Sequence, residues 1–455
     1  MKNNRHYYTA FLLLMAFMAF SCSQQEEPLP VEADGEIVFM AGMPGVETRS
    51  QTTKAGSLDG GFYVTAFCPE DATTIDGLGN MSEYFAEQLV TKTPGMGNAF
   101  HSEMCRWPEN TGAKEGTLKF FAFYPSREAL RELAGGNESN FNLKNSSTKK
   151  GTTTTYKYVM EKFKVGRDIS RHVDFVMAIA QENKKNGLYS GVALTFEHPL
   201  AKIDLKAYGN PTAFDVEIAG IRIGNVYTES GLDLTKSGTW TLQTRGVVEY
   251  IYQEGESVIQ IKNGGQYTTT AKATSLMGNA GSAFVIPASY SRWTKAATNT
   301  GLYFSVLLRV KDIDGMQLYP YIEGASMNTS TTTAKMNVIY FAVNKSTGLI
   351  NKRVYKKSGV YYSDEEGTIP YTVNENEEIR DYGWAAFPPA NATTTIKAAT
   401  QYTFTFNYTS GVGVEDPADV IPGKAIITAV TPGVSVTTFA SGGVTDVTDK
   451  ITIIP

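Results

Sequence analysis

The chain has 455 residues and a formal net charge of −5, with 42 glycines, 25 tyrosines and 23 phenylalanines. It is too long for one hydrophobic core, which predicts two or three domains. The many aromatic, β-branched and glycine residues favour strands joined by tight turns. Because no basic block is present, the sequence lacks the electrostatic footprint of a nucleic-acid-binding protein.

The N-terminus has the layout of a secretory signal. Lys2 and Arg5 precede an apolar run, residues 10–20, that is too short to span a bilayer as a permanent helix. Cys22 follows a small residue after this run, which resembles a bacterial lipobox. We therefore expect residues 1–21 to be a lipoprotein signal peptide and Cys22 to become the lipidated N-terminus. The alternative is an ordinary cleaved signal with an incidental cysteine, although no Ala-x-Ala site ends the run.

The segment after the signal predicts a tether followed by strands. Residues 22–35 are polar and contain proline. Their acidic stretch, 23–27, resembles the export signal of some surface lipoproteins of Gram-negative cells, and a solvated linker is the alternative. The first strand is expected at 36–41 and the second at 61–68, with a loop-like segment at 42–54 between them.

Helical signals are few. Ser82 is a candidate cap for a short helix that carries Phe85 and Leu89 four residues apart. Ser126 is a candidate cap for a second helix over 127–133. Both are expected to be minor elements of an all-β chain.

Strand signals dominate the rest of the chain. Alternating apolar and polar residues predict strands with one buried face, and continuous apolar runs predict strands covered on both faces. The alternating stretches are 192–196, 201–207, 302–311 and 402–408, and the apolar runs are 337–343 and 425–430. Their short spacing is typical of antiparallel sandwiches. The best boundary lies near 209–211, which gives domains over 36–209 and 210–455.

Cys68 and Cys105 remain once Cys22 is assigned to lipid. Two remaining cysteines in an exported chain permit a disulfide between them. Buried thiols are the alternative, because the sequence alone does not bring the two residues together.

The sequence contains no recognisable constellation for catalysis or metal binding. It lacks a nucleophile elbow, a P-loop and a dinucleotide-binding fingerprint, and its histidines show no metal-ligand spacing. The nearest approach to a cluster is His172-Val173-Asp174, which a polar turn explains more simply. We therefore expect no enzymatic activity, no cofactor and no metal.

Two further groups of residues have weak functional alternatives. The acidic clusters 364–366 and 375–378 fit solvated loops better than a weak cation site. Trp240, Trp293 and Trp384 have side chains that stack on sugars elsewhere, but positions in the core or rim of a sandwich explain them more simply.

Several local strings occur in an order that spans nearly the whole chain. After the lipobox these are Thr48-Arg49-Ser50, Arg106-Trp107-Pro108, Leu118–Pro125, Asp174–Ala178, Leu194–Ile203, Phe284–Pro287 and the aromatic strand Tyr402–Tyr408. The most specific is the Phe-x-His-x-Leu-Ala-Lys-Ile pattern at 196–203. Together the strings resemble the fimbrillin family, the subunits of type V pili of Bacteroidales-type Gram-negative bacteria.

The resemblance implies two tandem transthyretin-like antiparallel β-sandwich domains. It also implies an assembly route that begins with a lipidated precursor at the outer membrane. An arginine-specific protease cuts the N-terminal loop, and release of the first strand opens a hydrophobic groove. A strand from the C-terminal region of a neighbouring subunit then fills the groove.

On this sequence the cut is expected between Arg49 and Ser50, which removes the strand at 36–40. Val38 and Met40 are expected to fill alternate pockets before the cut. Two C-terminal segments with alternating apolar residues are donor candidates. They are the segment with Val434 and Val436 and the segment with Ile451 and Ile453.

We therefore expect a structural or adhesive pilus subunit at the cell surface. Its expected partners are other fimbrillin subunits, outer-membrane lipid through Cys22, the arginine-specific protease and host or bacterial surface ligands. The alternative is a surface lipoprotein that does not polymerise and binds glycans or host ligands through exposed aromatic residues.

Overall fold

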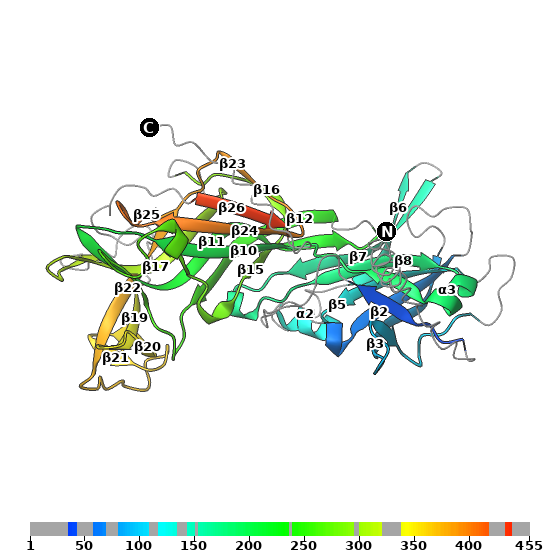
Figure 1. The fold of residues 1–455 in the computed structure, drawn as a ribbon, viewed down its shortest axis with the longest axis horizontal. Helices are drawn as coiled ribbons and strands as arrows, with labels where there is room; N and C mark the ends of the chain where they lie inside the picture. The colour runs from blue at the N-terminus through cyan, green and yellow to red at the C-terminus, as the bar shows by residue number, and fades with distance from the viewer. Residues whose placement is uncertain are drawn as a thin grey trace, which may run out of the picture.

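Strands dominate the computed structural model. It describes residues 35–42, 58–69, 81–108, 117–133, 143–150, 153–235, 239–294, 300–320, 338–417 and 433–438. Within these ranges the α-helices are α2 (Arg127–Leu133) and α3 (Lys184–Ser190), and no helix is long and apolar enough to cross a membrane. The predicted all-β fold is confirmed, and Figure 1 shows two lobes joined by long strands.

The N-terminal lobe is a seven-stranded sheet that closes on itself. Its strand order is β8-β5-β2-β3-β4-β1-β9. The strands are β1 (Phe39–Gly42), β2 (Phe62–Pro69), β3 (Met81–Lys92), β4 (Ala99–His101), β5 (Leu118–Tyr124), β8 (Val176–Glu182) and β9 (Val192–Thr195). Met177 of β8 and Glu197, just beyond β9, exchange backbone hydrogen bonds of 3.0 and 2.8 Å. These bonds join the two ends of the order, so the sheet is a closed barrel.

The continuous aromatic run of β5 is explained by burial on both faces. Phe120 points into the barrel, where its ring meets Phe39. Phe121 points outward and contacts Tyr158 of β7 (Thr153–Lys164), with ring centroids 5.3 Å apart. The barrel thus packs against a second core, and β5 has no solvent-facing side that would need polar residues.

The C-terminal lobe contains two main sheets, of five and twelve described strands. The smaller has the order β14-β10-β24-β26, with β15 beside β10. Its strands are β10 (Ala201–Tyr208), β14 (Thr274–Ser275), β15 (Ala283–Val285), β24 (Thr400–Asn407) and β26 (Gly433–Thr438). Separately, β16 (Ala288–Ser291) pairs with β23 (Thr393–Ile396).

The larger sheet has the order β21-β20-β19-β22-β17-β11-β7-β6, with β12 and β13 beside β11, β18 beside β17 and β25 beside β22. Its strands besides β7 are β6 (Leu143–Lys150), β11 (Phe214–Asp233), β12 (Thr239–Ile251), β13 (Ile259–Ile261), β17 (Tyr303–Asp312), β18 (Gln317–Tyr319), β19 (Ile339–Asn344), β20 (Ile350–Lys357), β21 (Val360–Tyr362), β22 (Glu377–Phe387) and β25 (Val414–Glu415). Phe304 of this sheet and Phe404 of the smaller sheet have ring centroids 4.2 Å apart. The two sheets therefore pack face to face as a sandwich.

The predicted domain boundary near 209 does not separate the two lobes. β10 pairs in parallel with β24 from Lys202 to Tyr208, so it belongs to the C-terminal lobe. β7 pairs with β11, where Val159 lies opposite Asp233, so β7 also joins a C-terminal sheet. Alternation identified β10 correctly but carries no information on which distant strand it pairs with, and β7 was not predicted.

The predicted helix after Ser82 is wrong, because this segment is strand β3. The pairing of β2 with β3 shifts register around Glu87, which has φ of 47°. Residues four apart share a face in a regular strand as well as in a helix, so the spacing of Phe85 and Leu89 did not distinguish the two. The helix over 127–133 is confirmed, and the amide of Ala129 donates to Ser126 Oγ over 3.1 Å.

The predicted strands at 36–41, 61–68, 192–196, 201–207, 302–311, 337–343 and 402–408 correspond to β1, β2, β9, β10, β17, β19 and β24. The predicted strand at 425–430 lies outside the described residues.

Candidate functional site

Strand β1 lies inside the barrel wall, with a neighbour on each side. Phe39 is opposite Phe100 of β4 in an antiparallel pair. On its other side Phe39 is opposite Val192 of β9 in a parallel pair. β1 therefore closes the barrel between β4 and β9, although it is the first described strand of the chain.

Backbone hydrogen bonds extend this pairing from Gly35 to Gly42. The amide of Ile37 donates to Cys105 O and the amide of Trp107 donates to Gly35 O, each over 2.8 Å. On the β9 side the amide of Val192 donates to Val38 O over 2.8 Å. The first strand is thus held by ladders on both edges, with no edge left to solvent.

The inward side chains of this strand are Ile37, Phe39 and Ala41, which are at most 5% exposed. Val38 and Met40 are half-buried on the opposite face, so the prediction that they fill the pockets is wrong by one residue. Ile, Val, Phe and Met are all apolar here, so the sequence does not show which face of the strand is inward.

Glu36 forms a polar contact at the start of the strand. Its Oε1 lies 3.2 Å from Arg106 Nη2, and its Oε2 lies 3.9 Å from His101 Nδ1. The Glu36 side chain is 11% exposed, whereas those of Arg106 and His101 are 48% and 37% exposed. Sequence reasoning missed this contact, because the partners are far apart in the chain and meet only after β1 pairs.

One of the two predicted donor segments is a strand. β26 pairs antiparallel with β24, with Val434 opposite Phe404 and Val436 opposite Tyr402. It lies at the end of the described order of the smaller sheet. Ile451 and Ile453, the lipidation residue Cys22 and the cleavage residues Arg49 and Ser50 lie outside the described residues.

Cys68 and Cys105 lie in the same lobe as thiols, without the disulfide that the sequence permitted. Cys105 is fully buried in the barrel core, and Cys68 is partly buried against that core. Burial raises the pKa of the Cys105 thiol to about 12, which keeps it neutral at physiological pH.

His172 and His198 join segments of the fold. His198 Nδ1 lies 2.8 Å from Asp174 Oδ1, and both side chains are buried. His172 Nδ1 accepts from the amide of Phe284 over 3.1 Å, which links the N-terminal half to β15. Burial raises the pKa of Asp174, while His198 opposes that shift. The described residues include no group of three or more His, Cys, Asp or Glu suited to a metal ion.

The tryptophans and acidic clusters also have structural positions. Trp293 and Trp384 are buried, and Trp240 is half-buried with its Nε1–H donating to Pro199 O. Asp364 organises a turn, and the hydrogen bond from the Thr368 hydroxyl, with two backbone amides, lowers its pKa to about 2. Because their side chains are buried or half-buried, Trp240, Trp293 and Trp384 are poorly placed to stack on a glycan.

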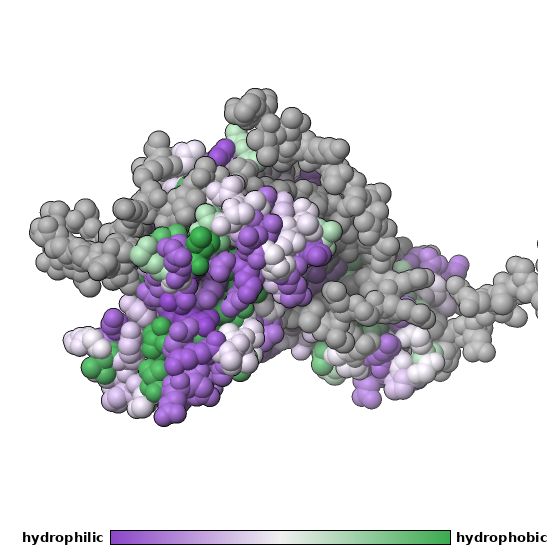
Figure 2. All heavy atoms as spheres, turned by 60° about the vertical axis from the view of Figure 1, so that its left-hand side comes forward, coloured by the Kyte–Doolittle hydropathy of each residue, from purple (hydrophilic) through white to green (hydrophobic). Residues whose placement is uncertain are grey.

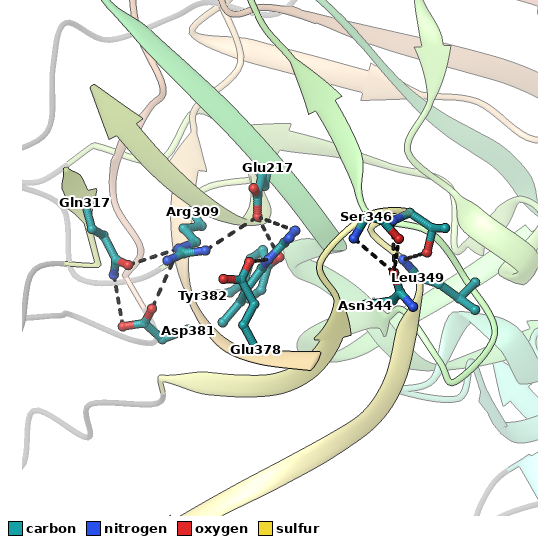
Figure 3. A network of polar contacts seen from close by, with 11 residues as sticks. Glu217, Arg309, Gln317, Asn344, Ser346, Leu349, Glu378, Asp381 and Tyr382 are labelled. Atoms are coloured by element: carbon teal, nitrogen blue, oxygen red, sulfur yellow. Dashed lines mark hydrogen bonds and ion pairs between the residues drawn. The ribbon is translucent and has the colours of Figure 1, made fainter. Parts of the chain in front are cut away.

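A partly buried ionic network lies on the larger sheet of the C-terminal lobe (Figure 3). Arg380 Nη1 donates to Glu217 Oε2 over 3.2 Å, and Arg309 lies 3.8 Å from both Glu217 and Asp381. Burial, with the Glu217 carboxylate beside it, raises the pKa of Tyr382 well above its ordinary value. These residues come from β11, β17 and β22, so the network fixes how these strands pack, and no sequence pattern indicated it.

Comparison with known proteins identifies the family. The model of the fimbrillin-like family matches residues 61–319, more than half of the chain. The chain therefore belongs to the fimbrillin-like family. No curated protein matches the chain.

The solved structures that match the chain have low sequence identity and low TM-scores. A candidate cell-adhesion protein from Bacteroides uniformis is 13% identical, with a TM-score of 0.35, and the match covers 89% of this chain and 100% of that one. A candidate cell-adhesion protein from Parabacteroides distasonis is 10% identical, with a TM-score of 0.37 and coverage of 90% and 98%. The fimbrial anchor protein Mfa2 from Porphyromonas gingivalis is 11% identical, with a TM-score of 0.24 and coverage of 62% and 81%.

Proposed function

We propose that the chain is a non-catalytic structural or adhesive subunit of a cell-surface pilus, assembled by strand exchange at the β1 position. In this proposal the precursor is a lipoprotein anchored through Cys22. A cut between Arg49 and Ser50 separates β1 from the rest of the chain. A strand from another subunit then takes the place of β1 between β4 and β9.

The observation that carries the proposal is the position of β1 in a closed barrel. Loss of β1 exposes an edge of β4 and an edge of β9, each with unpaired amide and carbonyl groups. Loss also empties the sites of Ile37 and Phe39, whose burial contributes about 1.5–3 kcal/mol each. An inserted strand satisfies both needs, as in β-strand addition elsewhere.

The covalent link explains why a cut is needed. While β1 is part of the same chain, its effective concentration at the barrel is high, and an external strand competes poorly. Arg49 belongs to the connection between β1 and the 3₁₀ turn Leu58–Gly60. After the cut, β1 is held by its pairing and packing alone, and exchange becomes possible.

Repetition of the exchange produces a filament. The donor site and the acceptor site are different surfaces, so each added subunit presents a new acceptor. Figure 2 shows that one face of the C-terminal lobe is largely hydrophilic, with hydrophobic residues in separate patches. Among the described residues on the side shown, the hydrophobic patches are separate, a surface that suits assembly through strands better than through a broad apolar face.

The proposal is tested in cells by the variant Arg49→Ala, with Lys54→Ala as a control in the same connection. We expect Arg49→Ala to remain full length and monomeric, while Lys54→Ala is processed and assembles. Immunoblots report processing, and electron microscopy with size-exclusion of surface fractions reports assembly. Filaments formed by full-length Arg49→Ala protein would contradict the proposal. A wild-type protein that is monomeric under all processing conditions would instead support the non-polymerising lipoprotein.

A further inference from the structure

We propose that the β1 site is selective for a strand from a different subunit that carries an acidic residue just before its first inward apolar side chain. This inference rests on the proposed strand exchange and concerns which strand the site accepts. The chain's own C-terminal segments fit the site less well than such a strand.

The basic side chains at one end of the site favour an acidic residue in the inserted strand. Glu36 precedes the first inward residue, Ile37, and its carboxylate lies 3.2 Å from Arg106 and 3.9 Å from His101. Arg106 and His101 belong to the barrel and stay when β1 leaves. A replacement strand places its own side chain at the Glu36 position, where an acid is attracted and a lysine is repelled.

The inward positions of β1 also define which sizes of side chain the site accommodates. The ring of Phe39 lies edge-on to Phe62 and Phe120, so the central position accommodates a large side chain. The third inward residue is Ala41, which is 5% exposed, and its amide donates to Asn98 O over 3.1 Å. A well-matched strand therefore has an acid at the Glu36 position and large apolar residues at the Ile37 and Phe39 positions. At the Ala41 position it has a small residue with a backbone N–H.

The segment with Ile451 and Ile453 matches only the middle of this pattern. When Ile451 takes the place of Ile37, Lys450 takes the place of Glu36 and faces Arg106. Pro455 then takes the place of Ala41 and has no amide to donate to Asn98. A shift of two residues puts Asp449 at the buried Ile37 position, where an unpaired carboxylate is costly.

The segment with Val434 and Val436 also matches poorly. When Val434 takes the place of Ile37, Gly433 replaces the acid and Thr438 places a hydroxyl at the Ala41 position. This segment is moreover paired with β24 in the structure, so donation would break that pairing. The pattern of the site therefore fits a donor from another kind of subunit better than a second copy of this chain.

The experiment measures binding of fluorescent peptides to full chain that has been cut at Arg49, by anisotropy. Two peptides span 34–42, one native and one with Glu36→Lys. Two more span 449–455, one native and one with Lys450→Glu. We expect each acid-bearing peptide to bind about fivefold or more tightly than its lysine-bearing counterpart at low salt, with the ratio falling as salt is raised.

The variant Arg106→Glu provides the decisive control, because it should reverse the order within each pair of peptides. Equal affinity within both pairs, or tighter binding of the lysine-bearing peptides to the wild-type chain, would overturn the charge selectivity while leaving strand exchange intact. If none of the four peptides binds the cut chain, strand exchange at β1 itself is wrong, and the selectivity fails with it.

Discussion

The ring of Phe39 in β1 lies edge-on against the ring of Phe120 in β5, with centroids 5.4 Å apart and planes at 86°. Phe39 also meets Phe62 at 6.3 Å in a similar arrangement. A strand of four residues near the start of the chain thus supplies a central part of the barrel core. The strand β1, which we propose to be removable, is therefore also needed for the packing of the barrel core.

Phe39→Ala should therefore destabilise the uncut protein by about 3–5 kcal/mol, because it removes a buried ring and leaves a cavity. Met40→Ala is the matched control on the half-buried face and should cost about 1 kcal/mol or less. Urea unfolding followed by tryptophan fluorescence gives both values. Equal costs for the two variants would show that β1 does not pack as described.

The sequence predicted the fold class and most strands because side-chain alternation reflects burial on one face of a sheet. It failed in β3, where the four-residue spacing of Phe85 and Leu89 fits a helix as well as a strand. It also placed the wrong residues of β1 inward, because Val38 and Met40 are as apolar as Ile37 and Phe39.

The sequence predicted which segment forms the candidate site, but not how that segment pairs with other strands. The Thr48-Arg49-Ser50 string and the strand before it suggested a removable strand. Nothing in the sequence showed that β1 pairs in parallel with β9, more than a hundred residues away, or that Glu36 meets Arg106. Such contacts depend on long-range pairing, which local patterns do not encode.

Gly187→Ala should destabilise the barrel by about 1–3 kcal/mol, through overpacking against Trp107. A Cβ at Gly187 would clash with Trp107 Cζ2, and this clash outweighs the gain in helix propensity within α3. Gly60→Ala is the control, because nothing lies within 4 Å of a Cβ there. Thermal unfolding compares the two, and a Gly187→Ala protein as stable as wild type would contradict the close packing of α3.

Burial of Cys105 should make stability fall as pH rises above about 9. The folded thiol has its pKa raised from 9.0 to about 12, so in this range the unfolded chain releases a proton that the folded chain retains. The unfolded state then binds fewer protons, and the contribution of this group to stability declines by about 1 kcal/mol per pH unit. The measurement compares wild type with Cys105→Ala by urea unfolding between about pH 8 and pH 10, a range that brackets the pKa of the thiol in the unfolded chain. Identical pH slopes would contradict the burial of the thiol.

Lipidation is tested by Cys22→Ala, which should yield an exported protein that is no longer bound to the membrane, since acyl burial supplies the anchor. Fractionation and electrophoretic mobility check this outcome. Retention of the Cys22→Ala protein in the membrane fraction with unchanged mobility would contradict the lipoprotein assignment.

The central claim, that β1 must leave the barrel before assembly, is tested most directly by locking it in place. Met40 and Ala99 are directly opposite in the antiparallel β1–β4 pair, a geometry compatible with a disulfide. The variant has Met40→Cys and Ala99→Cys in a chain whose Cys68 and Cys105 are replaced by alanine. After cleavage at Arg49, we expect the oxidised protein to keep β1 and stay monomeric, and the reduced protein to form filaments, as seen by electron microscopy. Filaments from the oxidised, cleaved protein, with the disulfide verified by mass spectrometry, would contradict the account.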